Sequence, residues 1–244
     1  PHCEKLKNRV VLLDFPDPSD PVAALQWRLL FDSSYAAFYF PWIAVDSKNG
    51  GRIEIPPSGF AAGIMARCDE TYGVHKAPAN EIMEGVVDMS SEIKDEDIGY
   101  MNGEGINCIK SFPSRGIRIW GARTTSSDPQ LRFVNVRRVI SSIIRALETN
   151  MQWVVFEPNS PRLWKSVTRN ITFFLNDLYK KGFFKGGTPE EAFFVKCDEE
   201  TNPPEARDAG QLIVEIGVSP VRPAEFIVFR LQEQMEEAGL GTEV

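Results

Sequence analysis

Hydrophobic residues recur at helical spacing in two long stretches of the chain, Val134–Thr149 and Arg162–Lys181. A repeat of three to four residues places such side chains on one face of an amphipathic α-helix. The second stretch has the more regular apolar stripe, formed by Leu163, Val167, Ile171 and Leu175. We therefore predict two long helices, and Gly182 marks the end of the second.

Short apolar runs rich in β-branched and aromatic residues predict the strands. Two such runs are Arg9–Asp14 and Tyr35–Val45. Between them, Asp20-Pro21 is a helix-start signal, and we predict a helix over the following residues, Val22–Phe31. This β-α-β order indicates a parallel crossover, so we expect an α/β layer whose remaining strands lie upstream of this chain. The other expected elements are a helix over Phe60–Glu70 capped by Ser58, and strands at Ile106–Ile109, Ile117–Trp120, Trp153–Phe156, Phe193–Lys196 and Leu212–Val218.

A continuous apolar run, Phe226–Phe229, lies between Pro223 and the charged tail Glu233–Glu237. Apolar residues at such a position must be covered by other residues. Two interpretations follow from the pattern. The run is a closing strand of its own domain, or it is an arm that adds a strand to a neighbouring copy of the chain.

Composition excludes several classes of protein. The 244 residues are 43% hydrophobic and 25% charged, proportions typical of a globular chain rather than a disordered one. The formal charge of −7 at pH 7 argues against general nucleic-acid binding. The longest nearly unbroken apolar run, Ala36–Val45, contains Pro41 and is about half of the ~20 residues that a membrane-spanning helix needs. We expect neither a nucleic-acid partner nor membrane insertion.

Residues suited to catalysis or metal binding are scarce. The four cysteines are scattered without a C-x-x-C pair and there are two histidines, so we expect no metal, no other cofactor and a reducing compartment. The stretch Gly103-Glu104-Gly105 lacks the further glycine of a phosphate-binding loop. His75 follows Asp69 and Glu70, but a lone histidine in a loop bounded by glycine and proline is more often structural than catalytic.

Charged residues form three groups. Acidic residues gather between Glu84 and Asp97, and a basic cluster lies at the start of the first long helix. A basic stripe follows the polar face of the second long helix. For both basic groups an ordinary solvated face and docking onto an acidic protein surface stay open as interpretations. The basic cluster is Arg132, Arg137 and Arg138, and the basic stripe is Arg162, Lys165 and Arg169.

Nine short motifs follow one another along the chain: YAAFYFPWIAV at 35–45, PPSG at 56–59, GVHKAPAN at 73–80, GIN at 105–107, GART at 121–124, VNVRR at 134–138, WVVFEPN at 153–159, AFFVKC at 192–197 and GVSPVRPAEFI at 217–227. Each motif is weak alone. Together, in this order, they resemble the tail sheath protein of contractile phage tails and of related contractile injection particles. The family usually has leucine after GART, where this chain has Thr125.

The resemblance implies a tail-sheath core of mixed α+β and α/β class. Residues 1–130 would be the remainder of the sheath α/β domain, residues 131–221 a smaller domain with two helices and a β-hairpin, and residues 222–244 a C-terminal arm. It implies a structural subunit, not an enzyme, that forms stacked hexameric rings around an inner tube and contracts to drive the tube through a target cell envelope. The implied partners are further copies of the subunit, the inner tube protein, and baseplate and tail terminator or cap proteins. The implied location is the bacterial cytoplasm for assembly, within a phage tail or a cytoplasmic or released particle.

The resemblance also implies the surfaces that join subunits, with Gly217–Pro223 as a hinge. The donated strand would be Ala224, Glu225, Phe226, Ile227, Val228, Phe229, Arg230 and Leu231. The receiving hairpin would comprise Phe193, Phe194, Val195, Lys196, Leu212, Ile213, Val214, Glu215 and Ile216. The basic stripe would contact the inner tube. Two alternatives are an α/β enzyme with a site in the loops of residues 73–121, and a non-contracting scaffold derived from a sheath.

Overall fold

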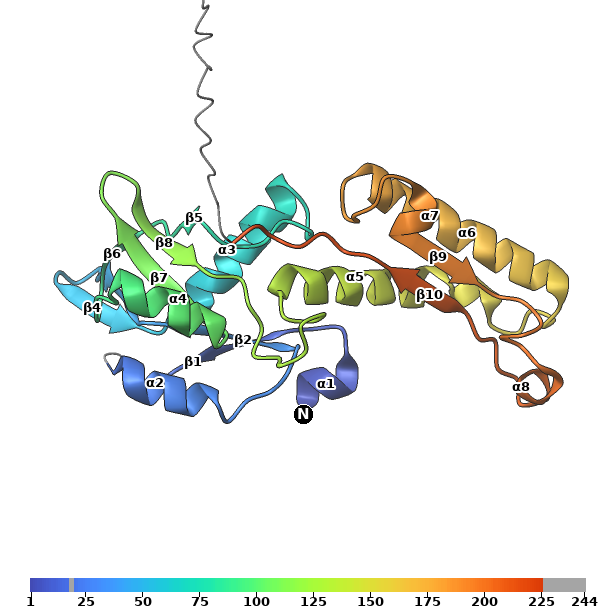
Figure 1. The fold of residues 1–244 in the computed structure, drawn as a ribbon, viewed down its shortest axis with the longest axis horizontal. Coiled ribbons are helices and arrows are strands. Elements are labelled where there is room, and N and C mark those ends of the chain that lie inside the picture. The colour runs from blue at the N-terminus through green and yellow to red at the C-terminus, as the bar shows by residue number, and fades with distance from the viewer. Residues whose placement is uncertain (18–19, 226–244) are drawn as a thin grey trace, which may run out of the picture.

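The main sheet of the computed structural model contains five strands in the order β1-β2-β7-β8-β5 (Figure 1). The structure describes residues 1–17 and 20–225. Neighbouring strands β1, β2 and β7 are parallel, whereas β8 is antiparallel to both β7 and β5. The strands are β1 (Val11–Asp14), β2 (Ala36–Phe40), β5 (Glu81–Ile82), β7 (Ile106–Phe112) and β8 (Gly116–Trp120).

The predicted parallel β-α-β unit is confirmed. Helix α2 (Pro21–Arg28) connects β1 to β2, and its first turn is capped by the Asp20 side chain. One carboxylate oxygen of Asp20 accepts hydrogen bonds from the backbone N–H groups of Val22 and Ala23, at 2.9 and 3.0 Å. This cap, followed by Pro21 in the first turn, explains why the helix begins where the sequence predicts it.

Strand β2 is buried on both faces. Ala37 and Tyr39 belong to a core that includes helix α3 (Ser58–Thr71), and Phe38 and Phe40 belong to a second core with α2 and helix α4 (Asp95–Gly103). A strand covered on both faces is apolar at every position, which accounts for the continuous hydrophobic run in the sequence.

The prediction of one strand over Tyr35–Val45 is wrong. Pro41 and Trp42 separate β2 from β3 (Ile43–Asp46), which lies in a different sheet. Proline has no N–H for a ladder, and the indole nitrogen of Trp42 donates to the Phe15 carbonyl at 2.7 Å. The second sheet has the order β4-β3-β6, with β4 at Arg52–Ile55 and β6 at Val86–Met89.

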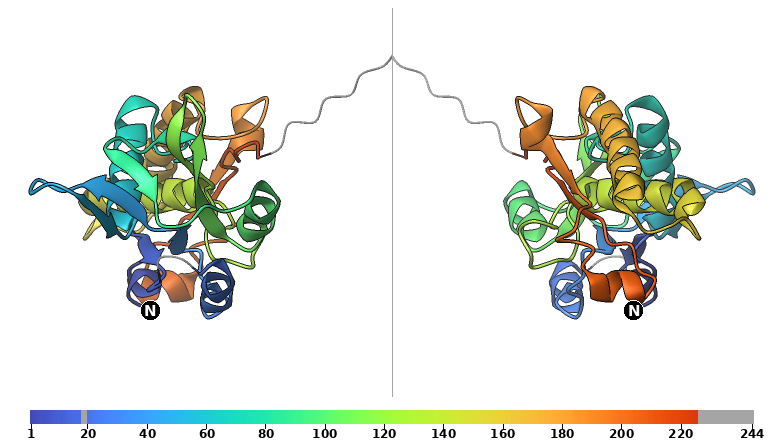
Figure 2. Two further views of the ribbon diagram at one scale, coloured as in Figure 1. Left: turned by 90° about the vertical axis from the view of Figure 1, so that its left-hand side faces the viewer. Right: turned by 90° about the vertical axis from the view of Figure 1, so that its right-hand side faces the viewer.

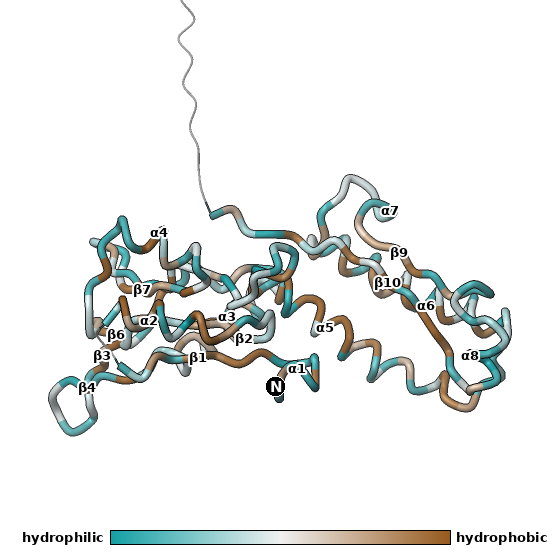
Figure 3. The backbone as a smooth tube through the Cα atoms, turned by 60° about the horizontal axis from the view of Figure 1, so that its bottom comes forward, coloured by the Kyte–Doolittle hydropathy of each residue, from teal (hydrophilic) through white to brown (hydrophobic). Residues whose placement is uncertain are grey.

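Helices α5 (Val134–Asn150) and α6 (Pro161–Lys180) form the two long helices that the sequence predicts. Both contribute to a third core, shared with strands β9 (Phe193–Lys196) and β10 (Glu215–Val218). Figure 2 shows α6 beside the β9–β10 hairpin at one end of the molecule, and Figure 3 shows hydrophobic and polar positions alternating along α5. Short helices complete the described chain: α1 (His2–Leu6), α7 (Pro189–Ala192), α8 (Pro204–Asp208) and the 3-10 turn η1 (Gln152–Val154).

Two further predictions differ from the structure. Trp153–Phe156 is not a strand, because the N–H groups of Val154 and Val155 bond to Met151 and Gln152 and continue the turns of α5. Phe156 is consequently fully exposed at the surface. Ser58 is the first residue of α3 rather than its side-chain cap, and its own N–H donates to the Asp14 carboxylate at 3.0 Å.

The structure confirms the mixed α/β class. No helix within residues 1–17 and 20–225 combines the length and apolarity needed to cross a membrane.

Candidate assembly surfaces

The β9–β10 hairpin is a two-stranded antiparallel sheet that lies on α6. Two strands alone are marginally stable in water, so the apolar face of α6 is needed to support them. The register pairs Phe193 with Val218 and Lys196 with Glu215. Across the described residues, these two strands pair with each other and join no further strand. The hairpin therefore presents edges at which another strand could be added.

Gly217 and Phe194 form a cross-strand pair in which the aromatic ring covers the glycine. A Cβ atom at residue 217 would overlap Cε1 of Phe194. Only glycine leaves room for the ring at this position. The contact gives a physical reason for the glycine at the start of the GVSP motif.

The predicted strand Leu212–Val218 begins three residues later than expected, at Glu215. The backbone of Ile213 is bonded instead to the buried side chain of Asn202. The Ile213 N–H donates to Asn202 Oδ1 at 2.7 Å, and Asn202 Nδ2 donates to the Ile213 carbonyl at 3.0 Å. Of the predicted receiving residues, Leu212, Ile213 and Val214 therefore precede β10, while the remainder lie in β9 and β10.

The segment after β10 is held along its length rather than free. The Ser219 N–H donates to the Ala192 carbonyl at 2.9 Å, and the Ser219 carbonyl accepts from the Lys185 N–H at 2.8 Å. The Val221 N–H donates to the Phe183 carbonyl at 3.1 Å, and its carbonyl accepts from Asn135 Nδ2 at 3.0 Å. In Figure 1 this segment runs back from the hairpin toward the main sheet.

Glu225, the last described residue, pairs with Arg123 of the same chain. Arg123 Nε donates to Oε1 of Glu225 at 2.9 Å, and Nη2 donates to Oε2 at 2.5 Å. The hydrogen bonds to the Glu225 carboxylate raise the pKa of Arg123 above its ordinary value. Ala224 is exposed beside this pair, and residues 226–231 of the predicted donated strand lie outside the described residues.

Asn107 fixes the backbone that carries Arg123. Its Nδ2 donates to the Arg123 carbonyl at 2.8 Å, and its Oδ1 accepts from the Arg123 N–H at 2.6 Å. A Cβ at Gly121 would lie 2.9 Å from the Cα of Asn107, so the two segments approach closely because residue 121 is glycine. The GIN and GART motifs thus meet at one buried joint.

The start of α5 extends this joint. Arg137 Nη1 donates to the Tyr35 hydroxyl at 3.0 Å, and Arg138 forms a two-pronged ion pair with Asp69 on α3. Two of the three side chains of the basic cluster, Arg137 and Arg138, therefore already have partners within the chain. Docking of this cluster onto an acidic partner is not supported.

His75 has a structural environment. Its ring lies against Phe183 with centroids 4.3 Å apart, and burial lowers its pKa. Its carbonyl accepts from Asn135 Nδ2 at 2.8 Å. Asp69, the acidic residue considered as its partner, pairs with Arg138. Within residues 1–17 and 20–225, no group of three His, Cys, Asp or Glu residues is placed to hold a metal ion.

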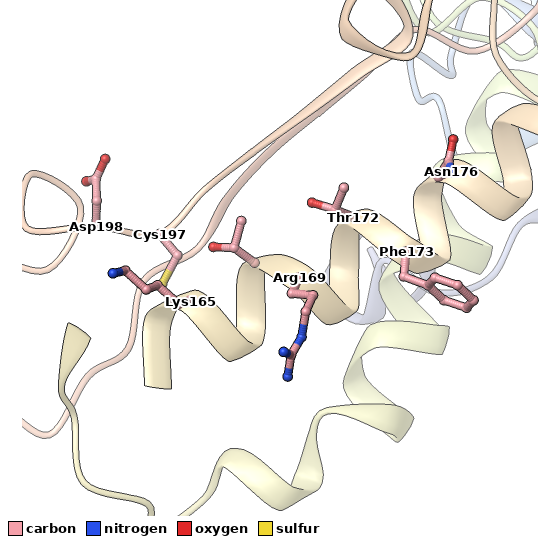
Figure 4. A pocket seen from close by; sticks show the side chains of 8 residues that line it. Lys165, Arg169, Thr172, Phe173, Asn176, Cys197 and Asp198 are labelled. Atoms are coloured by element: carbon pink, nitrogen blue, oxygen red, sulfur yellow. The ribbon is translucent and has the colours of Figure 1, made fainter. Parts of the chain in front are cut away.

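The basic stripe lies on the exposed side of α6. Lys165 and Arg169 line a groove of about 660 Å³ together with Cys197 and Asp198, which follow β9 (Figure 4). Arg162 is exposed but outside this lining. Phe173, on the same side of the helix, is 77% exposed. None of the three cations forms an ion pair within the described part of the chain.

The acidic residues between Glu84 and Asp97 are partly neutralised within the chain. Glu84 pairs with Arg67 at 2.7 Å and Asp88 with Arg52 at 3.2 Å. Asp95 pairs with Lys110 at 2.6 Å. The acidic surface is therefore weaker than the sequence suggests.

Sequence reasoning missed Asn107, Asn135 and Asn202 as individual residues. Each is a buried amide that bonds to backbone groups distant in sequence. The only indication of Asn107 and Asn135 in the sequence was that they belong to the GIN and VNVRR motifs.

Comparisons with known proteins agree with these observations. A family model described as the phage tail sheath protein central domain matches residues 2–125, and one described as the phage tail sheath C-terminal domain matches residues 126–233. The tail sheath protein of Burkholderia phage BcepMu is 30% identical over 195 residues, which cover 76% of this chain and 39% of that protein.

Two solved structures also match at 34% sequence identity. The PVC sheath complex of an extracellular contractile injection system, in its contracted state, has a TM-score of 0.84 over 91% of this chain and 63% of its own. The baseplate of the anti-feeding prophage, 6-fold symmetrised, has a TM-score of 0.81 over 93% of this chain and 60% of its own. This chain thus spans about 60% of these structures' chains. The chain belongs to the phage tail sheath family, as its motifs predict.

Proposed function

We propose that this chain is the polymerising part of a contractile tail sheath subunit, and that it forms stacked hexameric rings around an inner tube. The observation that carries the proposal is the uninterrupted match of the central and C-terminal sheath domains, in order, to residues 2–233. Membership in a family of structural proteins identifies the chain as a structural protein rather than an enzyme. It acts in a phage tail or a phage-like contractile particle, assembled in the bacterial cytoplasm.

The proposed partners are further copies of the subunit, the tube protein, and baseplate and terminator or cap proteins. A relative in a contracted sheath complex supports self-assembly, and a relative in a baseplate supports contact with that structure. We place the domain boundaries at residues 130/131 and 221/222, with residues 222–244 as the arm.

The β9–β10 hairpin receives the arm of a neighbouring copy in this proposal. Its unpaired edges and the alternating exposure of β9, where Phe193 is buried and Phe194 is exposed, suit the addition of a third strand. Backbone hydrogen bonds of such a strand would persist while rigid subunits rotate against one another.

Truncation after Glu225 tests the arm. The shortened chain keeps every described contact, so it should remain folded and soluble but fail to form long polymers. A truncation after Leu240, which keeps the apolar run, is the matched control. Tubular polymers of normal length from the chain ending at Glu225 would refute arm donation.

The basic stripe of α6 is the proposed contact with the inner tube. Its exposed, unpaired cations beside the exposed Phe173 ring suit an acidic partner surface. Replacing Arg162, Lys165 and Arg169 with glutamate should abolish co-assembly with the tube. Glutamate at Lys48, Lys94 and Lys185, three exposed cations outside α6, controls for net charge. Unchanged co-assembly of the stripe variant would exclude the contact.

A further inference from the structure

The last described residues cross a cavity rather than packing into a core. A space of about 950 Å³ lies between the main sheet, α4 and the segment of residues 221–225. Trp120 and Lys110 line it from the sheet, Tyr72 from the end of α3, and Pro223 from the segment. None of residues 221–225 belongs to the three hydrophobic cores, so the segment depends on polar contacts at its ends.

The two polar anchors are Asn135 at Val221 and Arg123 at Glu225. Arg123 is the stronger of the two, because its guanidinium makes two parallel hydrogen bonds to one carboxylate and a third bond to the Gly103 carbonyl at 3.1 Å. The side chains of Arg123 and Glu225 are 11% and 24% exposed. Such a pair is less screened by water than a surface ion pair, and removing one partner leaves the other poorly solvated.

The backbone of Arg123 is held by contacts that do not involve Glu225. Asn107, fully buried on β7, bonds to both backbone groups of residue 123. The guanidinium is therefore presented from the main sheet at a fixed point, and the segment is brought to it.

We propose that Arg123 and Glu225 form a clamp that sets where the C-terminal arm leaves the subunit. The described segment is then fixed as far as Glu225, rather than hinged over Gly217–Pro223 as predicted. Opening the clamp frees residues 222–225 as far as the anchor at Val221, which adds about 13 Å of reach at ~3.3 Å per residue. The clamp thus limits how far the arm extends to a neighbouring copy, and this consequence rests on the proposed arm donation.

Charge reversal tests the clamp in the full, unassembled chain. Hydrogen exchange of the amides in residues 215–225 is compared among the parent chain, Glu225→Gln, Glu225→Arg, Arg123→Glu and the double reversal. Each single variant should exchange roughly ten to a hundred times faster at Val221, whose N–H bonds to the Phe183 carbonyl, because this anchor opens more often once the clamp no longer holds the residues beyond it. The double reversal should exchange more slowly than either single reversal.

Glu225→Gln keeps the test valid if Arg123→Glu fails to fold, since Glu225 lies at the end of the described chain. Glu205→Arg, an exposed reversal on α8, should leave this exchange unchanged. Parent-like exchange in both Glu225 variants would overturn the clamp. Because the measurement needs no polymer, it separates failure of the clamp from failure of arm donation, which the truncation after Glu225 addresses.

Discussion

Three buried asparagine side chains form hydrogen bonds with backbone groups that lie outside the regular hydrogen bonding of the helices and strands. Asn107 bonds to Arg123, Asn135 to His75 and Val221, and Asn202 to Ile213. Each bond joins segments that meet only in the folded chain. Such residues stabilise little by their own burial, but their loss leaves buried polar groups without partners.

We predict that Asn107→Ala lowers the free energy of unfolding by roughly 2–4 kcal/mol, because the N–H and carbonyl of Arg123 lose their partners. Urea denaturation monitored by tryptophan fluorescence measures this change. Asn49→Ala, at an exposed loop position, should change stability by less than about 0.5 kcal/mol. Equal stabilities for the two variants would contradict the role assigned to Asn107.

Cys108 should be unreactive in the folded chain. Burial raises the pKa of its thiol to about 12, so at pH 8 it remains protonated and shielded. In the unfolded chain the thiol titrates near ~8.5, so the stability that this group contributes is lost as pH rises from there toward 12. Iodoacetamide at pH 8 should modify the partly buried Cys3 first. Modification of Cys108 at the rate seen in urea would contradict its burial.

At the scale of elements, the hairpin depends on one glycine. We predict that Gly217→Ala increases amide exchange across β9 and β10, because its Cβ would overlap the ring of Phe194. Gly63→Ala on α3 is the control, since a Cβ there meets no atom within 4 Å. Equal protection of the hairpin in both variants would show that the ring moves away without cost.

The long helices were predictable because their apolar stripes are local and regular. Strands β1 and β2 and helix α2 were predictable as well, because short apolar runs and the Asp20-Pro21 helix start are local signals. The structures of residues 151–156 and 212–214 were not predictable, since their apolar side chains suit a strand. The backbone of the first segment instead forms turns that continue α5, and the backbone of Ile213 bonds to the side chain of Asn202. At Pro41 the apolar pattern continued although the strand did not.

The candidate surfaces were predictable to different degrees. The exposure of Arg162, Lys165 and Arg169 followed from helical spacing alone. The Arg123–Glu225 pair joins residues separated by 102 positions, and no local pattern connects them. From the sequence, Glu225 was therefore predicted only as part of the donated strand, and Arg123 was noted only within the GART motif.

At the scale of the whole molecule, the motifs lie mostly at contacts between parts of the chain. GIN, GART, VNVRR and GVHKAPAN meet where the main sheet joins α5, and residues 217–225 run from the hairpin back to that joint (Figure 1). In the proposed assembly, a subunit that moves as a rigid body needs such a joint, and the proposed arm needs a fixed origin. Both features support the proposed exchange of an arm between subunits.

Electron microscopy of this chain, expressed with and without an inner tube protein, tests whether it forms a contractile sheath. A contractile sheath should form hollow striated cylinders in two forms, one long and narrow around the tube and one short and wide without it. Cylinders of a single length and width under both conditions would show a static scaffold. Either that result or dispersed subunits in both preparations would contradict a contractile sheath.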